Sequence, residues 1–253
     1  MFRQSYVSAR RRISFCFCAL AIVFAGSPAF ASCSNTSLKG VFGYLHGRPG
    51  TLSVVVVGQL TFDGQGDIIS ASWTESNNGS MTTGTTTGSY LIGPNCTGTL
   101  TLNDEDLGLS HFNIYLNSGN KMFQMIQTDP SNQPGFGIAE GTVTCGLSGK
   151  KLFLTTNLVG LVSGVPADTV GTVALDGEGN ITGTETFTTN GVVKTLAVTG
   201  IYTENSNCTG TWQITPTGGT ATHFNTVLVD NGNGLLLIQT DASTITAGNA
   251  QQW

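Results

Sequence analysis

The sequence predicts an all-β protein made of two tandem, antiparallel, eight-stranded up-and-down β-barrels, and three observations support this prediction. The first is an internal repeat, in which NCTGT (95–99), HFN (111–113) and IQTD (126–129) each recur 112 residues later. A fixed period of this kind indicates two copies of one structural unit. The second is an alternation of apolar and polar residues with a period of two, typical of strands with one buried face. The third is the shortness of the connections, which are rich in Gly, Asn, Asp and Pro.

The chain begins with a segment typical of a cleaved secretory signal peptide. Residues 1–31 combine a basic start, an apolar run from Ile13 to Ala25 and the small-residue cleavage site Ala29-Phe30-Ala31. The apolar run is shorter than the roughly 20 residues that a membrane-spanning helix needs. We therefore expect a mature chain that begins at Ser32 and is secreted, either to the periplasm or to the extracellular space.

Removal of this segment makes the chain strongly acidic. Four of the ten Lys and Arg residues leave with it, so 10 − 4 = 6 basic residues remain against 15 acidic ones, a formal net charge of −9. Binding to nucleic acid requires clustered Lys and Arg, and only Lys150-Lys151 are adjacent. The terminal Trp253 is typical of outer-membrane barrels, but residues 248–252 are too polar for a lipid-facing strand. The sequence therefore disfavours nucleic acid and membranes as partners.

Strands are expected wherever apolar residues alternate with polar ones. In the first copy, Leu52, Val54 and Val56 share one face, whereas Ser53 and Gln59 lie on the other. The expected strands of the first copy are 39–46, 51–62, 67–76, 81–92, 97–103, 109–117, 121–128 and 135–143. The second copy repeats the pattern from about residue 151 to residue 253, and no segment after the signal peptide has helical periodicity.

Closure of each set of eight strands into a barrel is expected because an open meander exposes two unpaired edges. Pairing of the eighth strand with the first removes both edges. The resulting domains are residues 32–144 and residues 145–253. Spacing alone does not distinguish a barrel from a sheet folded over itself, so a β-sandwich in each copy remains the alternative.

Four cysteines remain in the mature chain, and they predict one disulfide in each copy. Cys33 and Cys96 are 63 residues apart, and so are Cys145 and Cys208. In a meander, both members of each pair fall at the same end of the barrel, as a disulfide requires. Acylation of Cys33 as a lipoprotein is the alternative, but its counterpart Cys145 lies in mid-chain. A zinc site is disfavoured because no CxxC spacing occurs.

The loops at the opposite end of each copy differ in charge. The first copy is charged there and includes the acidic run Asp104-Glu105-Asp106, which we expect to be a solvated loop, whereas the second is nearly neutral. Loops on a rigid scaffold usually carry specificity, so the two copies are not expected to bind the same ligand. The loops are 46–50, 77–80, 104–108 and 129–134 in the first copy, and 160–168, 189–191, 215–220 and 241–247 in the second.

Two His–Asp pairs are the candidate ligand-binding residues. His111 and His223 occupy equivalent positions, and Asp129 and Asp241 follow the next strand in each copy. Such a pair can orient a group for proton transfer, but it can equally tie two strands together. No repeated Ser or free Cys nucleophile accompanies the pairs, so no catalytic residue is assigned.

Two further repeated motifs are interpreted as structural. DGQGD (63–67) and DGEGN (176–180) resemble calcium loops, but they lack the alternating ligands and the final Glu of an EF-hand. We expect them to be hairpin turns and assign no metal or cofactor. Asn95, Asn180 and Asn207 lie in glycosylation sequons, which matter only in a host that glycosylates such sites.

The DGxGN, NCTGT and IQTD phrases resemble exported, functionally uncharacterised bacterial proteins, and this resemblance implies no particular activity. In architecture, the expected units are similar to calycin and allene-oxide-cyclase or dirigent-like barrels, which include carriers and cyclases. The sequence therefore favours a secreted, non-catalytic binding or surface-associated protein, with a small apolar ligand or cell-surface material as its partner. A barrel-type isomerase or cyclase and a purely structural extracellular protein remain alternatives.

Overall fold

The computed structural model describes residues 32–47, 54–104, 108–117, 119, 121–129, 136–142 and 145–252. Both copies of the repeat lie in one compact unit, Ala31–Trp253. The expected signal peptide, residues 1–31, lies outside the described residues. None of the helices among the described residues has the length and apolarity needed to cross a bilayer.

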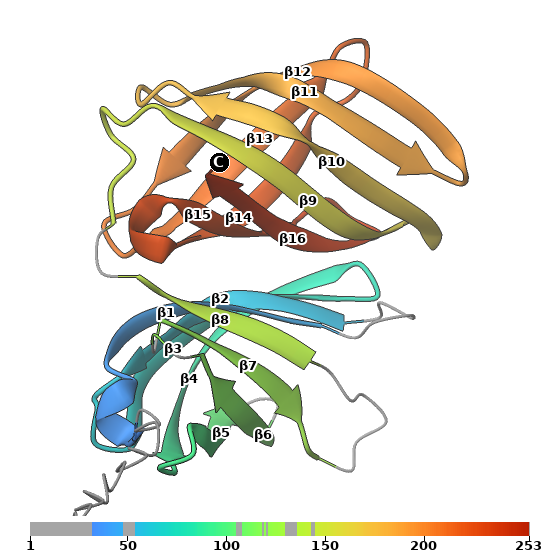
Figure 1. Cartoon of the computed structure of the whole chain (residues 1–253). Helices are drawn as coiled ribbons and strands as arrows, with labels where there is room; N and C mark the ends of the chain where they lie inside the picture. Colours follow the sequence, from blue (N-terminus) through green and yellow to red (C-terminus); the bar gives the residue numbers. More distant parts are fainter. Residues whose placement is uncertain are drawn as a thin grey trace, which may run out of the picture. The chain divides into compact units, whose positions relative to one another are not determined.

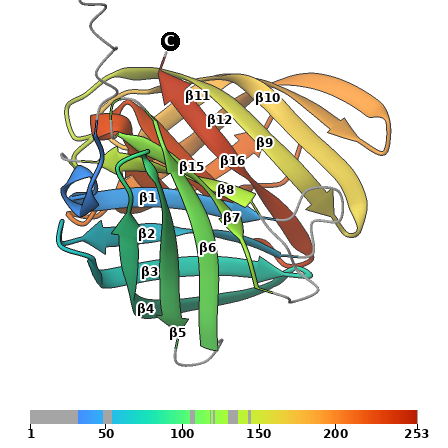
Figure 2. The ribbon, with the colours of Figure 1, turned by 60° about the horizontal axis from the view of Figure 1, so that its bottom comes forward.

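The first copy is a closed barrel of eight strands in sequence order, as predicted (Figures 1 and 2). Each strand pairs antiparallel with the next, and the last strand pairs with the first, with Tyr44 opposite Ala139. The sandwich alternative is therefore wrong. The strands are β1 (Gly40–Gly47), β2 (Val54–Phe62), β3 (Asp67–Asn77), β4 (Ser80–Ile92), β5 (Thr97–Asp104), β6 (Gly108–Leu116), β7 (Met122–Gln127) and β8 (Phe136–Thr142).

The second copy is also a closed barrel of eight strands, drawn from yellow to red in Figure 1. Its last strand pairs with its first, with Ala250 opposite Thr156. The strands are β9 (Leu152–Val162), β10 (Val165–Leu175), β11 (Asn180–Thr189), β12 (Val192–Glu204), β13 (Thr209–Pro216), β14 (Thr222–Val229), β15 (Gly234–Gln239) and β16 (Thr244–Gln252).

The period-two pattern of the sequence places apolar side chains inside each barrel. In β9, for example, Leu152, Leu154 and Leu158 are buried, whereas the adjacent Phe153 and Val159 are exposed. Each barrel has its own core built in this way. Burial of a side chain such as Leu contributes about 1.5–3 kcal/mol, so the alternation is sufficient to fix which face of each strand points inward.

The predicted disulfides, Cys33–Cys96 and Cys145–Cys208, are both present. In the first barrel, the chain after Cys33 forms a short 3₁₀ turn, Asn35–Ser37, and then buries Leu38 completely in the core. The hydroxyl of Tyr90 lies 3.0 Å from the carbonyl oxygen of Asn35 and 2.9 Å from that of Leu38. The segment therefore acts as a strap across the end of the barrel where the disulfide lies.

The second barrel has a strap of different construction at the same place. The carboxylate of Glu204 accepts hydrogen bonds from the backbone N–H groups of Gly146 and Leu147, the first at 2.8 Å. Leu147 is buried in the core of this barrel. Both straps thus close the barrel end that carries the cysteines, and each leaves the opposite end to the loops.

A third apolar cluster joins the outer surfaces of the two barrels. Val55 and Val57 of β2 are buried against residues of β14, β15 and β16, among them Val229 and Leu236. Polar contacts support the cluster, since Ser76 donates a hydrogen bond of 2.7 Å to the carbonyl oxygen of Thr244. Residues 54–57 of β2 are therefore packed against apolar side chains on both faces of the strand, which explains the run of four valines.

Candidate functional site

The predicted partners His111 and Asp129 are in direct contact on the outside of the first barrel. His111 lies in β6, and Asp129 follows the end of β7, which pairs with β6. His111 Nδ1 donates a hydrogen bond of 2.6 Å to Asp129 Oδ1, because an ionised carboxylate can only accept. The backbone N–H of His111 donates to Asp129 Oδ2 at 2.7 Å, and Gln127 Nε2 donates to the same oxygen at 3.2 Å.

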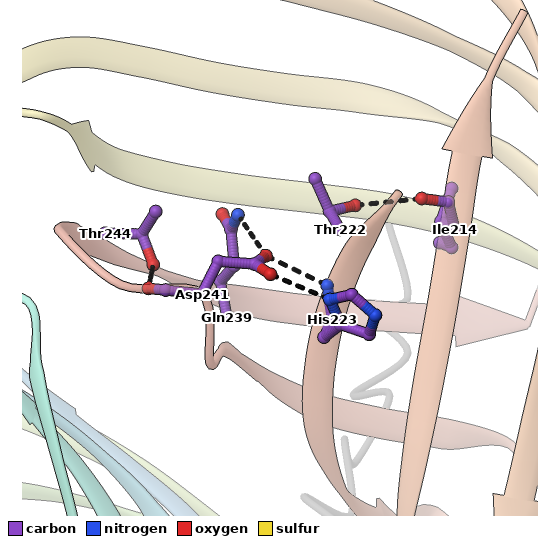
Figure 3. A network of polar contacts seen from close by, with 6 residues as sticks. All are labelled: Ile214, Thr222, His223, Gln239, Asp241 and Thr244. Atoms are coloured by element: carbon purple, nitrogen blue, oxygen red, sulfur yellow. Dashed lines mark hydrogen bonds and ion pairs between the residues drawn. The ribbon is translucent and has the colours of Figure 1, made fainter. Parts of the chain in front are cut away.

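The second barrel repeats this arrangement almost unchanged (Figure 3). His223 Nδ1 donates to Asp241 Oδ1 at 2.7 Å, and its backbone N–H donates to Asp241 Oδ2 at 2.9 Å. Gln239 Nε2 donates to the same oxygen at 2.9 Å. In Figure 3, the second ring nitrogen of His223 faces away from Asp241. The offset of 112 residues therefore reproduces a three-residue network as well as a sequence pattern.

Each His–Asp pair links two neighbouring strands of its barrel at their ends. Burial raises the pKa of Asp129 and Asp241, but the hydrogen bonds from the backbone and side chain of the histidine outweigh it and hold each pKa below the ordinary value. The His side chains are about half exposed. Each pair fixes one imidazole tautomer and leaves the other ring nitrogen accessible. A ligand-binding role for the pairs stays a prediction.

A cavity of about 340 Å³ opens inside the first barrel, at the end where β1, β3, β5 and β7 finish. This is the end opposite the disulfide. The space is lined by aromatic and acidic side chains together. Its lining residues are Tyr44, His46, Val54, Val56, Trp73, Glu75, Asn77, Thr86, Leu102, Asp104, Ser110, Phe112 and Gln127. Gln127, which supports Asp129, belongs to this wall as well as to the outer network.

Glycine makes room for the largest of these side chains. Gly58 lies opposite Tyr44 in the sheet, and a Cβ atom built on it would lie 2.7 Å from Tyr44 Cε1 and 2.2 Å from the carbonyl oxygen of Ser72. Gly84 lies opposite Trp73, where a Cβ would lie 2.3 Å from Trp73 Cζ2. The two rings can therefore lie flat against the barrel wall, because their cross-strand neighbours carry no side chain.

Two carboxylates and a phenol are brought together in the cavity. Asp104 Oδ2 accepts the indole N–H of Trp73 at 2.9 Å. Burial raises the pKa of Glu75, and the charge of Asp104 raises it further, although a hydrogen bond from Asn77 acts in the opposite direction. Burial, followed by the charges of Asp104 and Glu75, raises the pKa of Tyr44 far above its usual range. Tyr44 is thus a protonated hydrogen-bond donor beside two acids.

The equivalent positions of the second barrel carry different chemistry. The sheet register aligns Tyr44 with Thr156 and Trp73 with Glu185, since each pair occupies the same place opposite its neighbouring strands. Thr156 Oγ1 donates to Glu185 at 2.9 Å, and burial raises the pKa of this carboxyl group. The remaining counterparts are mostly apolar: Leu158 for His46, Phe187 for Glu75, Val198 for Thr86, Ile214 for Leu102 and Pro216 for Asp104.

Sequence reasoning did not identify the residues that line this cavity, and it placed Asp104 in a solvated loop. In the structure Asp104 is the last residue of β5 and is only 8% exposed. The signal was present in the alternation, because Asp104 continues the inward face of Leu100 and Leu102, and Glu75 continues that of Trp73. Glu105 and Asp106, the other members of the acidic run, lie outside the described residues.

The Asp carboxylates of the two turn motifs accept hydrogen bonds from the backbone of their own turns. Asp63 Oδ1 accepts hydrogen bonds from the backbone N–H groups of residues 65, 66 and 67, and Asp176 Oδ1 accepts from those of residues 178 and 180. The backbone hydrogen bonds lower the pKa of Asp63, and a hydrogen bond from the Asn180 side chain, followed by those from the backbone, lowers the pKa of Asp176 to about 2. Each carboxylate thus faces its own turn, as a hairpin turn requires. Within the described part of the chain, no three His, Cys, Asp or Glu side chains cluster as a metal site would need.

Comparison with known proteins adds no family. No family model matches the chain, and no curated protein matches it either. Among solved structures, the chain is similar to kievitone hydratase from Nectria haematococca, with 10% sequence identity, a TM-score of 0.28, and coverage of 89% of this chain and 94% of that one. A TM-score this low carries no argument about function. The chain is therefore described by its own architecture, two closed eight-stranded β-barrels in tandem, each with one disulfide.

Proposed function

We propose that this protein is a secreted small-molecule-binding protein whose first barrel holds the ligand in the cavity beside Tyr44, Trp73 and Phe112. The observation that carries the proposal is the asymmetry between the two barrel interiors. Most inward positions at the open end carry different residues in the two barrels, with Phe187 in place of Glu75. In the first barrel these side chains surround an open space walled by aromatic rings and a few polar groups, which is the usual composition of a ligand pocket.

The proposal separates the cavity from the outer His–Asp pairs. The pairs occur in both barrels with nearly identical Nδ1–Oδ1 distances, so they are a common feature of the two copies. Most of the cavity side chains differ between the copies, whereas Phe112 and Gln127 recur as Phe224 and Gln239. Because a binding site for one ligand is expected where the copies differ, the cavity is a better candidate for specificity than the pairs.

The test is native mass spectrometry of the mature protein purified from its own host, followed by extraction of the bound molecule. The variant His46→Leu/Glu75→Phe introduces the side chains of the second barrel into the cavity, and we expect it to lose the ligand. His111→Ala, which removes the outer pair, is the matched control and should retain it. If the His46→Leu/Glu75→Phe variant retains the ligand and His111→Ala loses it, the ligand binds at the outer His–Asp pair and not in the cavity. An empty protein that partitions with cell-wall material would instead support a surface-associated or purely structural role.

A second candidate function, acid–base catalysis by a barrel-type isomerase or cyclase, is favoured by one observation. Glu75 is a buried carboxyl group with a raised pKa, next to a second carboxylate and a phenol in a cavity. This combination is typical of general acids and bases. Incubation of the extracted ligand with the protein and with Glu75→Gln distinguishes the two functions. A product that forms only with the unaltered protein would establish catalysis, and an unchanged ligand would leave binding as the function.

A further inference from the structure

We propose that Gln127 determines the specificity of the cavity in the first barrel, and that it selects a small, flat aromatic molecule that carries an N–H or O–H group. This inference rests on the proposed function, since it names the class of ligand for the same cavity. It follows from the orientation of the Gln127 amide, the aromatic ring beside it and the volume of the cavity.

Asp129 fixes the orientation of the Gln127 amide. Gln127 Nε2 lies 3.2 Å from Asp129 Oδ2. An ionised carboxylate only accepts hydrogen bonds, so the amide must turn its nitrogen, and not its oxygen, toward Asp129. The carboxylate is itself held in place, because it accepts the backbone N–H of His111 at 2.7 Å and the ring Nδ1 of His111 at 2.6 Å. The amide oxygen of Gln127 is therefore the atom that remains for a ligand.

The second barrel repeats this orientation. Gln239 Nε2 donates to Asp241 Oδ2 at 2.9 Å. In Figure 3, the amide oxygen of Gln239 is turned away from Asp241. The repetition indicates that the His–Asp–Gln network, and not the surroundings of one barrel, sets the direction of the amide.

Gln127 lies beside an aromatic ring on the wall of the cavity. It is directly opposite Phe112 in the register of β6 and β7, and both residues line the cavity. Side chains directly opposite each other in an antiparallel pair have Cβ atoms about 4.5–5.5 Å apart. A flat molecule that packs against Phe112 therefore brings a group on its edge within reach of Gln127 Oε1.

The size of the cavity makes this contact selective. Its volume of about 340 Å³ accommodates a molecule with one or two rings, and a polar atom that enters such a space loses its water. A donor placed at Gln127 Oε1 regains a hydrogen bond, whereas an acceptor placed there meets a second acceptor. A site of this kind discriminates against analogues that lack the donor.

The experiment compares three bicyclic molecules of nearly the same shape by calorimetry on the complete mature protein. Indole carries an N–H group where benzofuran has an oxygen atom and indene has a methylene group. We expect indole to bind at one site per chain, about tenfold more tightly than benzofuran or indene. Gln127→Leu should remove this preference and leave the affinity for indene unchanged. Gln239→Leu, which removes the equivalent amide from the second barrel, is the matched control and should keep the full preference.

Asp129→Ala tests whether the orientation of the amide is the cause. Without the carboxylate, the amide of Gln127 is free to rotate and to present its nitrogen to the cavity. The preference for indole over benzofuran should then fall, whereas a purely structural role of Asp129 would weaken the binding of all three molecules equally. Asp241→Ala is the matched control in the second barrel, and circular dichroism verifies that each variant is folded.

The outcomes separate this inference from the proposed function. If benzofuran binds as tightly as indole, or if Gln127→Leu keeps the preference, the cavity binds ligands without selection by Gln127, and only the inference is wrong. If none of the three molecules binds, the ligand extracted from the native protein decides. A molecule with an N–H or O–H group that Gln239→Leu retains and Gln127→Leu loses supports the inference, and any other molecule overturns it. An absence of both bound probes and native ligand would overturn the inference and the proposed function together.

Discussion

Removal of either disulfide should lower the free energy of unfolding by about 4 kcal/mol. The two bridges close loops with the same sequence separation, 63 residues. In the chain-entropy model, a cross-link restricts the unfolded chain by an amount that depends only on the length of this loop, which gives about 4 kcal/mol at 25 °C. The double variants Cys33→Ala/Cys96→Ala and Cys145→Ala/Cys208→Ala should therefore lose similar amounts, although their straps differ in construction.

Urea unfolding of the mature protein provides the measurement. Trp73 lies in the first barrel and Trp212 in the second, so the fluorescence follows both barrels, and circular dichroism follows the sheets. Chemical reduction of the unaltered protein is the control, because it opens the bridges without removing buried sulfur atoms. Losses that differ between the two double variants by more than about 2 kcal/mol, or that stay below about 1 kcal/mol, would show that loop entropy does not determine the effect.

Three further perturbations test other parts of the structure. Glu185→Gln should stabilise the protein at neutral pH and have little effect below the pKa of Glu in the unfolded chain. Burial raises the pKa of Glu185 in the folded protein, so the wild type loses stability as the pH rises through that folded pKa. Urea unfolding at several pH values would show this difference, and an effect independent of pH would contradict it. Gly43→Ala should lower the free energy of unfolding by about 1–3 kcal/mol, since the added Cβ would lie 2.5 Å from the buried Val229 Cγ1. An unchanged midpoint of urea unfolding would mean that the two barrels separate easily. Asp241→Asn should remove stability that the wild type has above the pKa of Asp in the unfolded chain. The wild type itself loses this stability as the pH falls through the lowered folded pKa of Asp241. The free energies of unfolding of the two proteins should therefore converge in acid, and a difference that grows there would show that the Asp241 carboxylate does not stabilise the fold.

The architecture was predictable because it depends on patterns that recur along the whole chain. The alternation of apolar residues fixed the strands to within a few positions, and the Gly-rich turns fixed their antiparallel order. The disulfides followed from the equal spacing of four cysteines. The contact between each His and its Asp also followed, since residues in neighbouring strands of a meander lie side by side.

The cavity could not be derived in the same way, because it depends on how side chains of different strands fill a shared volume. Alternation places Glu75 and Asp104 on inward faces, but it does not show that the space between them stays open. The valines at 54–57 illustrate a related limit. Their continuous apolar run signals burial on both faces of β2, yet the partner on the outer face lies in the second barrel, and local sequence contains no information about it.

The division between the common and the divergent residues of the two barrels has an evolutionary and an engineering consequence. The disulfide, the Asp turn and the His–Asp pair are present at equivalent positions of both barrels, whereas most inward side chains at the open end have changed. Under the proposed function, the residues that stabilise the fold are different from those that would bind the ligand. After duplication, one copy can change its inward-facing side chains while the residues that stabilise the fold stay the same. In protein design, the inward-facing side chains of one barrel can likewise be introduced into the other barrel, because both have the same fold.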